Sequence, residues 1–178
     1  MGTRSQIAKQ IGPDAYRTVY CQLEGHLESQ GAMLLEHFNT QGRVDQILDL
    51  GDLYRLFPKL EPDPSLPHTF DQPQKGVTLS YHRDGQCPDM DAKIETLEEL
   101  GSAEDFIEFV YIFDQDQVWK YFQGGYLDEG LRDVKEDLEA LENGIDVIKP
   151  PPFDFLDEFP EDWPEDDGPQ EGMVMTGM

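Results

Sequence analysis

Residues 109–122 read FVYIFDQDQVWKYF, and this stretch decides the fold class. Two runs rich in aromatic and β-branched residues, 109–113 and 117–122, flank the turn-forming triplet Asp114-Gln115-Asp116. Such runs on either side of a short polar turn predict a β-hairpin. We therefore expect an antiparallel sheet to organise the chain.

A second hairpin is predicted at the start of the chain. Residues 3–11 and 16–23 read as strands, and the cluster Gly12-Pro13-Asp14 between them is typical of a turn. The two hairpins together indicate a sheet with at least four strands.

Two helices are predicted after this hairpin. Apolar residues at helical spacing between Leu27 and Phe38 indicate a first helix that packs on the hairpin. Asn39 or Thr40 can cap a second helix, which Gly51 would end. The opening order is therefore strand, strand, helix, helix.

The middle of the chain is less regular. Prolines make residues 58–76 a long irregular connection, because each lacks a backbone donor and disfavours helix in the residue before it. Alternating apolar and polar residues predict a strand at 77–82. Residues 93–108 read as a short strand followed by a helix, with Ser102 and Asp105 in the relation of a capping box.

A long amphipathic helix is predicted over residues 127–143, ended by Asn143-Gly144.

From Lys149 onward, prolines and acidic residues alternate with aromatic residues, a composition that does not build its own core. The predicted fold class is α+β, with an antiparallel sheet built from hairpins and helices packed on one face. We expect a single domain at 1–148 and an acidic, aromatic and proline-rich tail at 149–178.

The formal net charge is −25, and it is unevenly distributed. Residues 1–57 have a net charge of −2, residues 58–144 of −14 and residues 145–178 of −9. Affinity for phosphate backbones depends on lysine and arginine, so this composition argues against direct binding to nucleic acid or to anionic membranes. It favours a basic protein partner, although surface acidity that only confers solubility stays an alternative.

The chain offers no signal for export. Residues 1–5 lack the apolar run of a signal peptide, and no stretch approaches the roughly 18 apolar residues that span a membrane. We therefore expect a cytoplasmic protein. In that reducing compartment Cys21 and Cys87 are expected to be free thiols.

The sequence contains cysteine and histidine residues but no known catalytic or metal motif. Cys21 and His26, and again His82 and Cys87, are separated by four residues, which is not the spacing of a zinc motif. No nucleophile elbow, phosphate loop, dinucleotide fingerprint or zinc-protease motif is present. We expect no metal, no cofactor and no catalytic residue. The alternative is a small enzyme that uses Cys21 with His37 or His82.

Several stretches of the first half resemble a family of small, largely uncharacterised proteins of bacteriophages and bacterial mobile regions. Members of that family begin with Met-Gly-Thr-Arg-Ser and have a Tyr-Cys strand end, a Leu-Leu-Glu-His-aromatic segment and a Tyr-His-Arg-Asp segment. The matching stretches here are Met1 to Ser5, Tyr20-Cys21 with Gly25, Leu34 to Phe38, Leu50-Gly51-Asp52, His68-Thr69-Phe70 and Tyr81 to Asp84. The chain departs from the family at residues 22–26, where the family has His-Trp-Asp-Gly-Tyr. The resemblance implies a phage or mobile-element context, in which small acidic proteins that block host nucleic-acid enzymes are a plausible class.

We therefore expect a non-enzymatic acidic protein that mimics nucleic acid, or inhibits a basic nucleic-acid-binding defence protein of the host. The alternatives are a phage structural or assembly protein and the small enzyme; a homodimer stays open. Acidic side chains would replace phosphates and aromatic tail residues would anchor the partner, unless the tail packs on its own domain. The predicted partner-binding residues are Asp128, Glu129, Asp133, Glu136, Asp137, Glu139, Phe155, Asp157, Glu158, Phe159 and Trp163. Charge reversal at Asp133, Glu136, Asp137 and Glu139 is expected to weaken binding without unfolding the helix.

Overall fold

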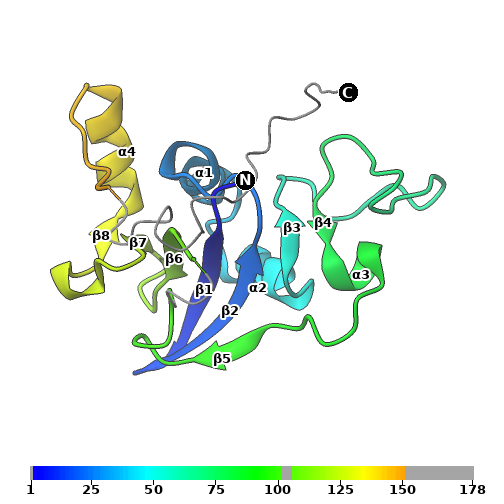
Figure 1. The fold of residues 1–178 in the computed structure, drawn as a ribbon, viewed down its shortest axis with the longest axis horizontal. Coiled ribbons are helices and arrows are strands. Elements are labelled where there is room, and N and C mark those ends of the chain that lie inside the picture. The colour runs from blue at the N-terminus through cyan, green and yellow to red at the C-terminus, as the bar shows by residue number, and fades with distance from the viewer. Residues whose placement is uncertain (1, 102–105, 151–178) are drawn as a thin grey trace, which may run out of the picture.

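A mixed β-sheet forms the centre of the molecule (Figure 1). The computed structural model describes residues 2–101 and 106–150. The described strands are β1 (Ser5–Gly12), β2 (Ala15–Cys21), β3 (Leu53–Arg55), β4 (Leu79–Ser80), β5 (Lys93–Glu95), β6 (Phe109–Phe113), β7 (Trp119–Gln123) and β8 (Arg132–Asp133). Their order in the sheet is β4-β3-β2-β1-β6-β7-β8, and β5 pairs with β2 beside this path.

Both predicted hairpins are confirmed. β1 pairs antiparallel with β2, and β6 pairs antiparallel with β7, with Tyr111 opposite Tyr121. The prediction of a purely antiparallel sheet is wrong, because β1 runs parallel to β6 and β2 runs parallel to β3. A parallel pair needs a long crossover, and residues 22–52 supply one between β2 and β3.

Helices cover one face of the sheet. The described helical segments are η1, a π-helical turn (Leu27–Gly31), α1 (Ala32–His37), α2 (Gln41–Asp49), α3 (Tyr81–Gly85), η3, a 3₁₀ turn (Leu127–Glu129), and α4 (Val134–Glu142). Residues of η1, α1, α2 and α4 form one buried cluster with residues of β1, β2, β6 and β7. Thr40 caps α2 as expected, since its hydroxyl accepts a hydrogen bond from the Arg43 backbone at 3.3 Å.

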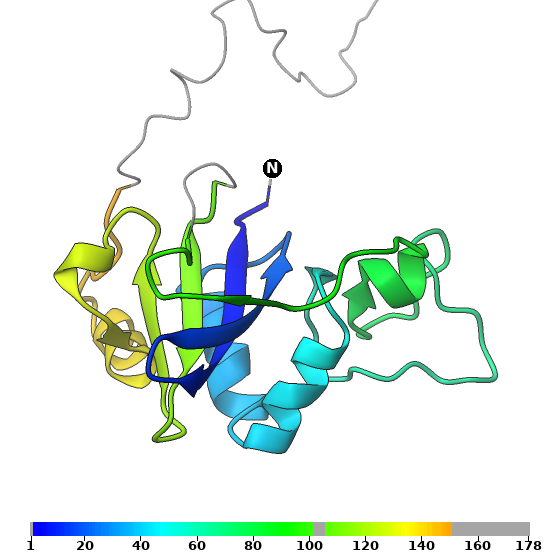
Figure 2. The same cartoon turned by 90° about the horizontal axis from the view of Figure 1, so that it is seen from below.

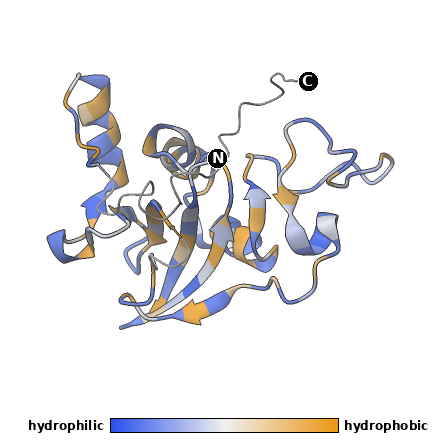
Figure 3. Ribbon diagram, viewed as in Figure 1, coloured by the Kyte–Doolittle hydropathy of each residue, from blue (hydrophilic) through white to orange (hydrophobic). Residues whose placement is uncertain are grey.

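The opposite face carries a second, smaller cluster. It joins residues of β1, β2, β6 and β7 to the segment that follows β5, and it includes Tyr16, Leu100 and Ile107. In Figure 2, β5 and its neighbouring segments cross the side of the sheet away from α1 and α2. Hydrophobic and hydrophilic residues succeed one another along several strands in Figure 3, as expected where one face of a strand is less buried than the other. β6, which is covered on both faces, is buried along its whole length.

The predicted strand at 77–82 is shorter than expected. Only Leu79–Ser80 is a strand, and α3 begins directly at Tyr81. The Ser80 hydroxyl accepts a hydrogen bond from the Arg83 backbone at 3.3 Å, which caps a helix where the apolar alternation predicted extended chain. After β5 the chain turns at 96–100 rather than forming a helix, and Ser102 and Asp105 lie outside the described residues.

The predicted helix at 127–143 is only half present. α4 begins at Val134, and the chain before it forms η3 and the short strand β8, which pairs with β7. Gly130 separates the two halves with φ 89°, a left-handed conformation that ends a right-handed helix. The apolar stripe is therefore divided: Leu138 packs against the helical face and Leu127 against the opposite face.

Candidate functional site

The predicted acidic surface lies at the end of the sheet formed by β7, β8 and α4 (Figure 1). Residues 126–150 contain eight acidic and three basic residues, a net charge of −5. The exposed carboxylates of this segment belong to Asp128, Glu129, Glu136, Glu139, Glu142 and Asp146. Four of the six acidic residues predicted between 128 and 139 are therefore presented to solvent.

Asp137 is a correction to the predicted surface. The residue is 6% exposed, and its carboxylate accepts hydrogen bonds from the Tyr121 hydroxyl at 2.7 Å and from Arg132 Nη2 at 3.0 Å. Position 137 points inward because it follows the buried Val134 by three residues, on the face of α4 that packs on β7. The carboxylate of Asp137 holds α4 on the sheet and does not face a partner.

Asp133 also stabilises the fold rather than facing solvent alone. It precedes α4 as its N-cap, and its carboxylate accepts a hydrogen bond from the Glu136 backbone at 3.0 Å. Both carboxylates bind groups of the fold, so we expect charge reversal at Asp133 and Asp137 to destabilise α4, in contrast to reversal at Glu136 and Glu139.

The beginning of the predicted tail is attached to this same end of the sheet. The side-chain amide of Gln123 donates to the Lys149 carbonyl at 3.0 Å and accepts from the Lys149 backbone at 2.9 Å. The Lys149 ammonium also pairs with Glu129 and lies over the Tyr126 ring. The predicted tail residues Phe155, Asp157, Glu158, Phe159 and Trp163 lie outside the described residues.

The geometry gives little support to a cysteine nucleophile. Cys21 is fully buried, and burial raises the pKa of its thiol to about 12. His37 and His82 are both exposed, and within the described ranges no interaction joins either ring to Cys21. Cys21 and Cys87 are free thiols, as predicted. Over residues 2–101 and 106–150, no group of three or more histidine, cysteine or acidic residues is placed to hold a metal ion.

We expect the two thiols to react at very different rates with a thiol reagent. Raising the pKa of Cys21 from 9.0 to about 12 lowers its thiolate fraction at neutral pH about a thousandfold, and burial also blocks access. Ellman's reagent should therefore label one thiol in the native protein and the second only in denaturant. A Cys87→Ser variant should show no fast reaction. Fast labelling of Cys21 in that variant would contradict its burial.

A buried polar cluster joins three of the segments that carry the family resemblance. The Asp84 carboxylate accepts hydrogen bonds from the Ser80 backbone at 2.8 Å, and from Arg83 Nε at 2.8 Å and Nη2 at 3.0 Å. His68 Nε2 lies 3.4 Å from the same carboxylate. The Ser80 hydroxyl donates to the Leu50 carbonyl at 2.8 Å, which adds the segment before β3.

His68 has a defined tautomer in this cluster. Its Nδ1 accepts a hydrogen bond from the Gln74 backbone at 3.0 Å, so the proton resides on Nε2, which faces the Thr78 carbonyl at 3.0 Å. The Gln74 side chain in turn bonds both backbone groups of Asp63. The cluster therefore fixes the proline-rich connection at 58–76 onto the sheet edge, which is a structural role.

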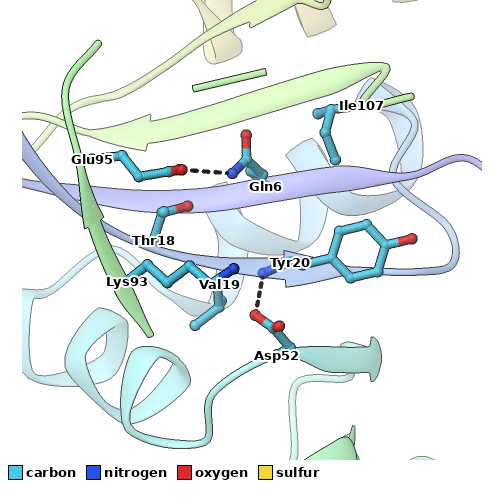
Figure 4. A pocket seen from close by; sticks show the side chains of 8 residues that line it. All are labelled: Gln6, Thr18, Val19, Tyr20, Asp52, Lys93, Glu95 and Ile107. Atoms are coloured by element: carbon cyan, nitrogen blue, oxygen red, sulfur yellow. Dashed lines mark hydrogen bonds between the residues drawn. The ribbon is translucent and has the colours of Figure 1, made fainter. Parts of the chain in front are cut away.

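A pocket of 230 Å³ opens on the sheet face opposite the helices (Figure 4). It is lined by Gln6, Thr18, Val19, Tyr20, Asp52, Lys93, Glu95 and Ile107. No sequence motif marks this pocket, because its charged residues come from two separate segments, Asp52 before β3 and Lys93 and Glu95 in β5. Its only signal was Leu50-Gly51-Asp52, one of the stretches that carry the family resemblance.

Asp52 is the best-positioned polar group of this pocket. Its backbone N–H donates to the Met90 carbonyl at 2.7 Å, and its carbonyl accepts from the Tyr81 backbone at 3.1 Å. Gly51 makes this approach possible: it has φ 76°, and a Cβ there would lie 2.2 Å from the Met90 oxygen. Burial raises the pKa of the Asp52 carboxyl, while the Tyr20 N–H and Lys93 act in the opposite direction.

Comparison with family models, curated proteins and solved structures finds no match to this chain. The family resemblance of the first half therefore stays a prediction. No helix in the part of the chain that the structure describes is long and apolar enough to cross a membrane.

Proposed function

We propose that the chain is a non-enzymatic acidic protein of phage or mobile-element origin, which occupies the basic surface of a nucleic-acid-binding protein in its host. The observation that carries the proposal is the placement of six exposed carboxylates within residues 126–150. They belong to the end of the sheet that α4 covers, in a segment with a net charge of −5. A basic surface that binds phosphates would be attracted to such an array.

The fold supports a fixed rather than a flexible array. Arg132 and Tyr121 hold Asp137, and Asp133 caps α4, so the helix that carries Glu136, Glu139 and Glu142 is tied to β7 and β8. Because the carboxylates are attached to a rigid helix, less conformational entropy is lost when a partner binds.

We expect a Glu136→Gln, Glu139→Gln, Glu142→Gln variant to bind the partner about tenfold more weakly. Each exposed ion pair contributes roughly 0.5 kcal/mol, and three of them sum to about the 1.4 kcal/mol that changes affinity tenfold. The partner is first captured from a host lysate with the full chain, and its dissociation constant is then measured for each variant over a range of salt concentrations.

A matched control removes three negative charges elsewhere. Asp71, Asp89 and Glu98 are exposed and lie outside 126–150, so an Asp71→Asn, Asp89→Asn, Glu98→Gln variant also has a net charge of −22. It should bind within about twofold of the wild type if position rather than total charge matters. Nucleic acid should also displace the chain from its partner. Equal losses in both variants, or simultaneous binding of chain and nucleic acid, would contradict the proposal.

A further inference from the structure

The pocket lies where the pairing partner of β2 changes. Along one edge of β2, residues Tyr16 to Thr18 pair with β5, and Cys21 pairs with Leu53 of β3. The Tyr20 backbone N–H falls between the two partner strands and donates to Asp52 Oδ1 at 2.9 Å. A side chain thus replaces a strand at this point, which leaves a hollow in the sheet edge.

One carboxylate oxygen of Asp52 is left for a ligand. Oδ1 accepts from Tyr20, whereas no donor within the described ranges reaches Oδ2. Asp52 is half-buried and lines the pocket, so Oδ2 can accept a hydrogen bond from a ligand there. The Asp52 backbone is held at both its N–H and its carbonyl, so the carboxylate is already oriented toward the pocket.

Lys93 supplies the opposite charge. Figure 4 shows its side chain reaching from β5 toward Asp52, and its ammonium lowers the pKa of that carboxyl. No described carboxylate lies within 4.0 Å of the ammonium, so the two charges face one pocket without forming an ion pair. Space for a bridging polar group remains between them.

The remaining wall is rigid and excludes large ligands. Gln6 Nε2 donates to Glu95 at 3.1 Å, and Gln6 Oε1 accepts from the Gly101 backbone at 2.6 Å, so both ends of this amide are satisfied (Figure 4). A volume of 230 Å³ is below that of ordinary drug-sized pockets, which begin at about 300 Å³. Only a small polar molecule fits.

We propose that this pocket binds a small zwitterion of the α-amino-acid class, with its ammonium on Asp52 and its carboxylate on Lys93. A free anion is disfavoured by the net charge of −25 and by Asp52 and Glu95. A simple cation would lie beside the Lys93 ammonium. A zwitterion avoids both repulsions and gives each of the two pocket charges an opposite partner. This site is separate from the acidic surface of α4, and its test does not depend on that proposal.

The test is a titration of the full chain by two-dimensional ¹H–¹⁵N NMR with glycine, L-alanine, L-serine and L-glutamine. At least one should produce saturable shifts at the backbone amides of Tyr20, Asp52 and Lys93, with a dissociation constant at or below about 1 mM. Ethylamine and propanoate each carry only one of the two charges. Each should bind at least about tenfold more weakly, because one charge-assisted hydrogen bond is missing.

Three variants assign the binding to named groups. Asp52→Asn keeps an acceptor for the Tyr20 N–H and removes the charge, and Lys93→Gln changes an exposed side chain; each should weaken binding about tenfold or more. Asp91→Asn is the control, because Asp91 influences Asp52 electrostatically without lining the pocket. Circular dichroism checks the fold, and Lys93→Gln decides alone if Asp52→Asn does not fold. The proposal is overturned if none of the four zwitterions binds, if ethylamine or propanoate binds equally well, or if Lys93→Gln binds like the wild type.

Discussion

Replacing Asp84 by alanine is expected to lower the free energy of unfolding by about 3–5 kcal/mol, the usual loss when one partner of a buried ion pair is removed. The Asp84 side chain is 2% exposed, and it accepts hydrogen bonds from the Ser80 backbone and from two nitrogens of Arg83. Alanine would leave the guanidinium without its carboxylate and the buried Ser80 N–H without an acceptor. Both costs fall on the folded state.

Urea denaturation monitored by circular dichroism measures this loss. Asp84→Asn should lose less than Asp84→Ala, because an amide oxygen can still accept from Ser80. Asp91→Ala is the control, since Asp91 is an exposed acidic residue seven positions later and its removal also makes the net charge less negative. If Asp84→Ala is as stable as Asp91→Ala, the cluster does not stabilise the fold.

The same variant should loosen the connection at 58–76 before the rest of the chain. Arg83 Nη1 donates to the Leu60 carbonyl at 2.8 Å, and His68 binds both the Thr78 carbonyl and the Gln74 backbone. These bonds depend on an Arg83 and a His68 that Asp84 orients. Limited proteolysis of Asp84→Ala should therefore cut within this connection first.

The two hairpins were predictable because their information is local. A turn triplet between two β-rich runs determines the pairing of β6 with β7, and a Gly-Pro-Asp cluster does the same for β1 and β2. The parallel pairing of β1 with β6 joins residues about a hundred positions apart, Ser5 with Phe109. No local pattern encodes such a contact, so the mixed character of the sheet could not be predicted from turns and periodicity.

The excess of acidic residues at this site was predictable from the sequence, but the exposure of each acidic residue was not. An acidic residue within a predicted amphipathic helix is expected to be exposed to solvent. Asp137 is instead buried, because Tyr121 and Arg132, which the pairing of β7 with β8 brings together, both bind its carboxylate. The pocket could not be predicted from the sequence, because Asp52 and Lys93 lie far apart in the chain and only the tertiary fold brings them to one pocket.

Alkaline pH is expected to unfold the protein cooperatively, because three buried acidic hydrogens cannot leave while it is folded. Tyr111 and Tyr121 are both 0% exposed, and burial raises the pKa of each phenol above its usual value. The Tyr111 hydroxyl donates to the Gly25 carbonyl at 2.6 Å, and the Tyr121 hydroxyl donates to Asp137 at 2.7 Å. Ionisation would remove the first bond and place a phenolate beside a carboxylate at the second. Burial likewise raises the pKa of the Cys21 thiol to about 12.

Because each pKa is raised in the folded state, the stabilisation is complete below the unfolded pKa values and is lost as the pH rises toward the folded ones. Between those values each group contributes a slope of about 1.4 kcal/mol per pH unit, so the three together give about 4 kcal/mol per unit above roughly pH 10. A domain of ordinary stability should then unfold between about pH 11 and 13. The chain has seven tyrosines, so the tyrosinate absorbance of Tyr121 is taken as the difference between the wild type and Tyr121→Phe. This difference should appear together with the loss of circular dichroism in one transition. Tyr121→Phe should reduce the slope by about a third, and added salt should not abolish the transition, because buried groups are poorly screened. A difference that develops while the circular dichroism is unchanged would contradict the packing of Tyr121 in the core.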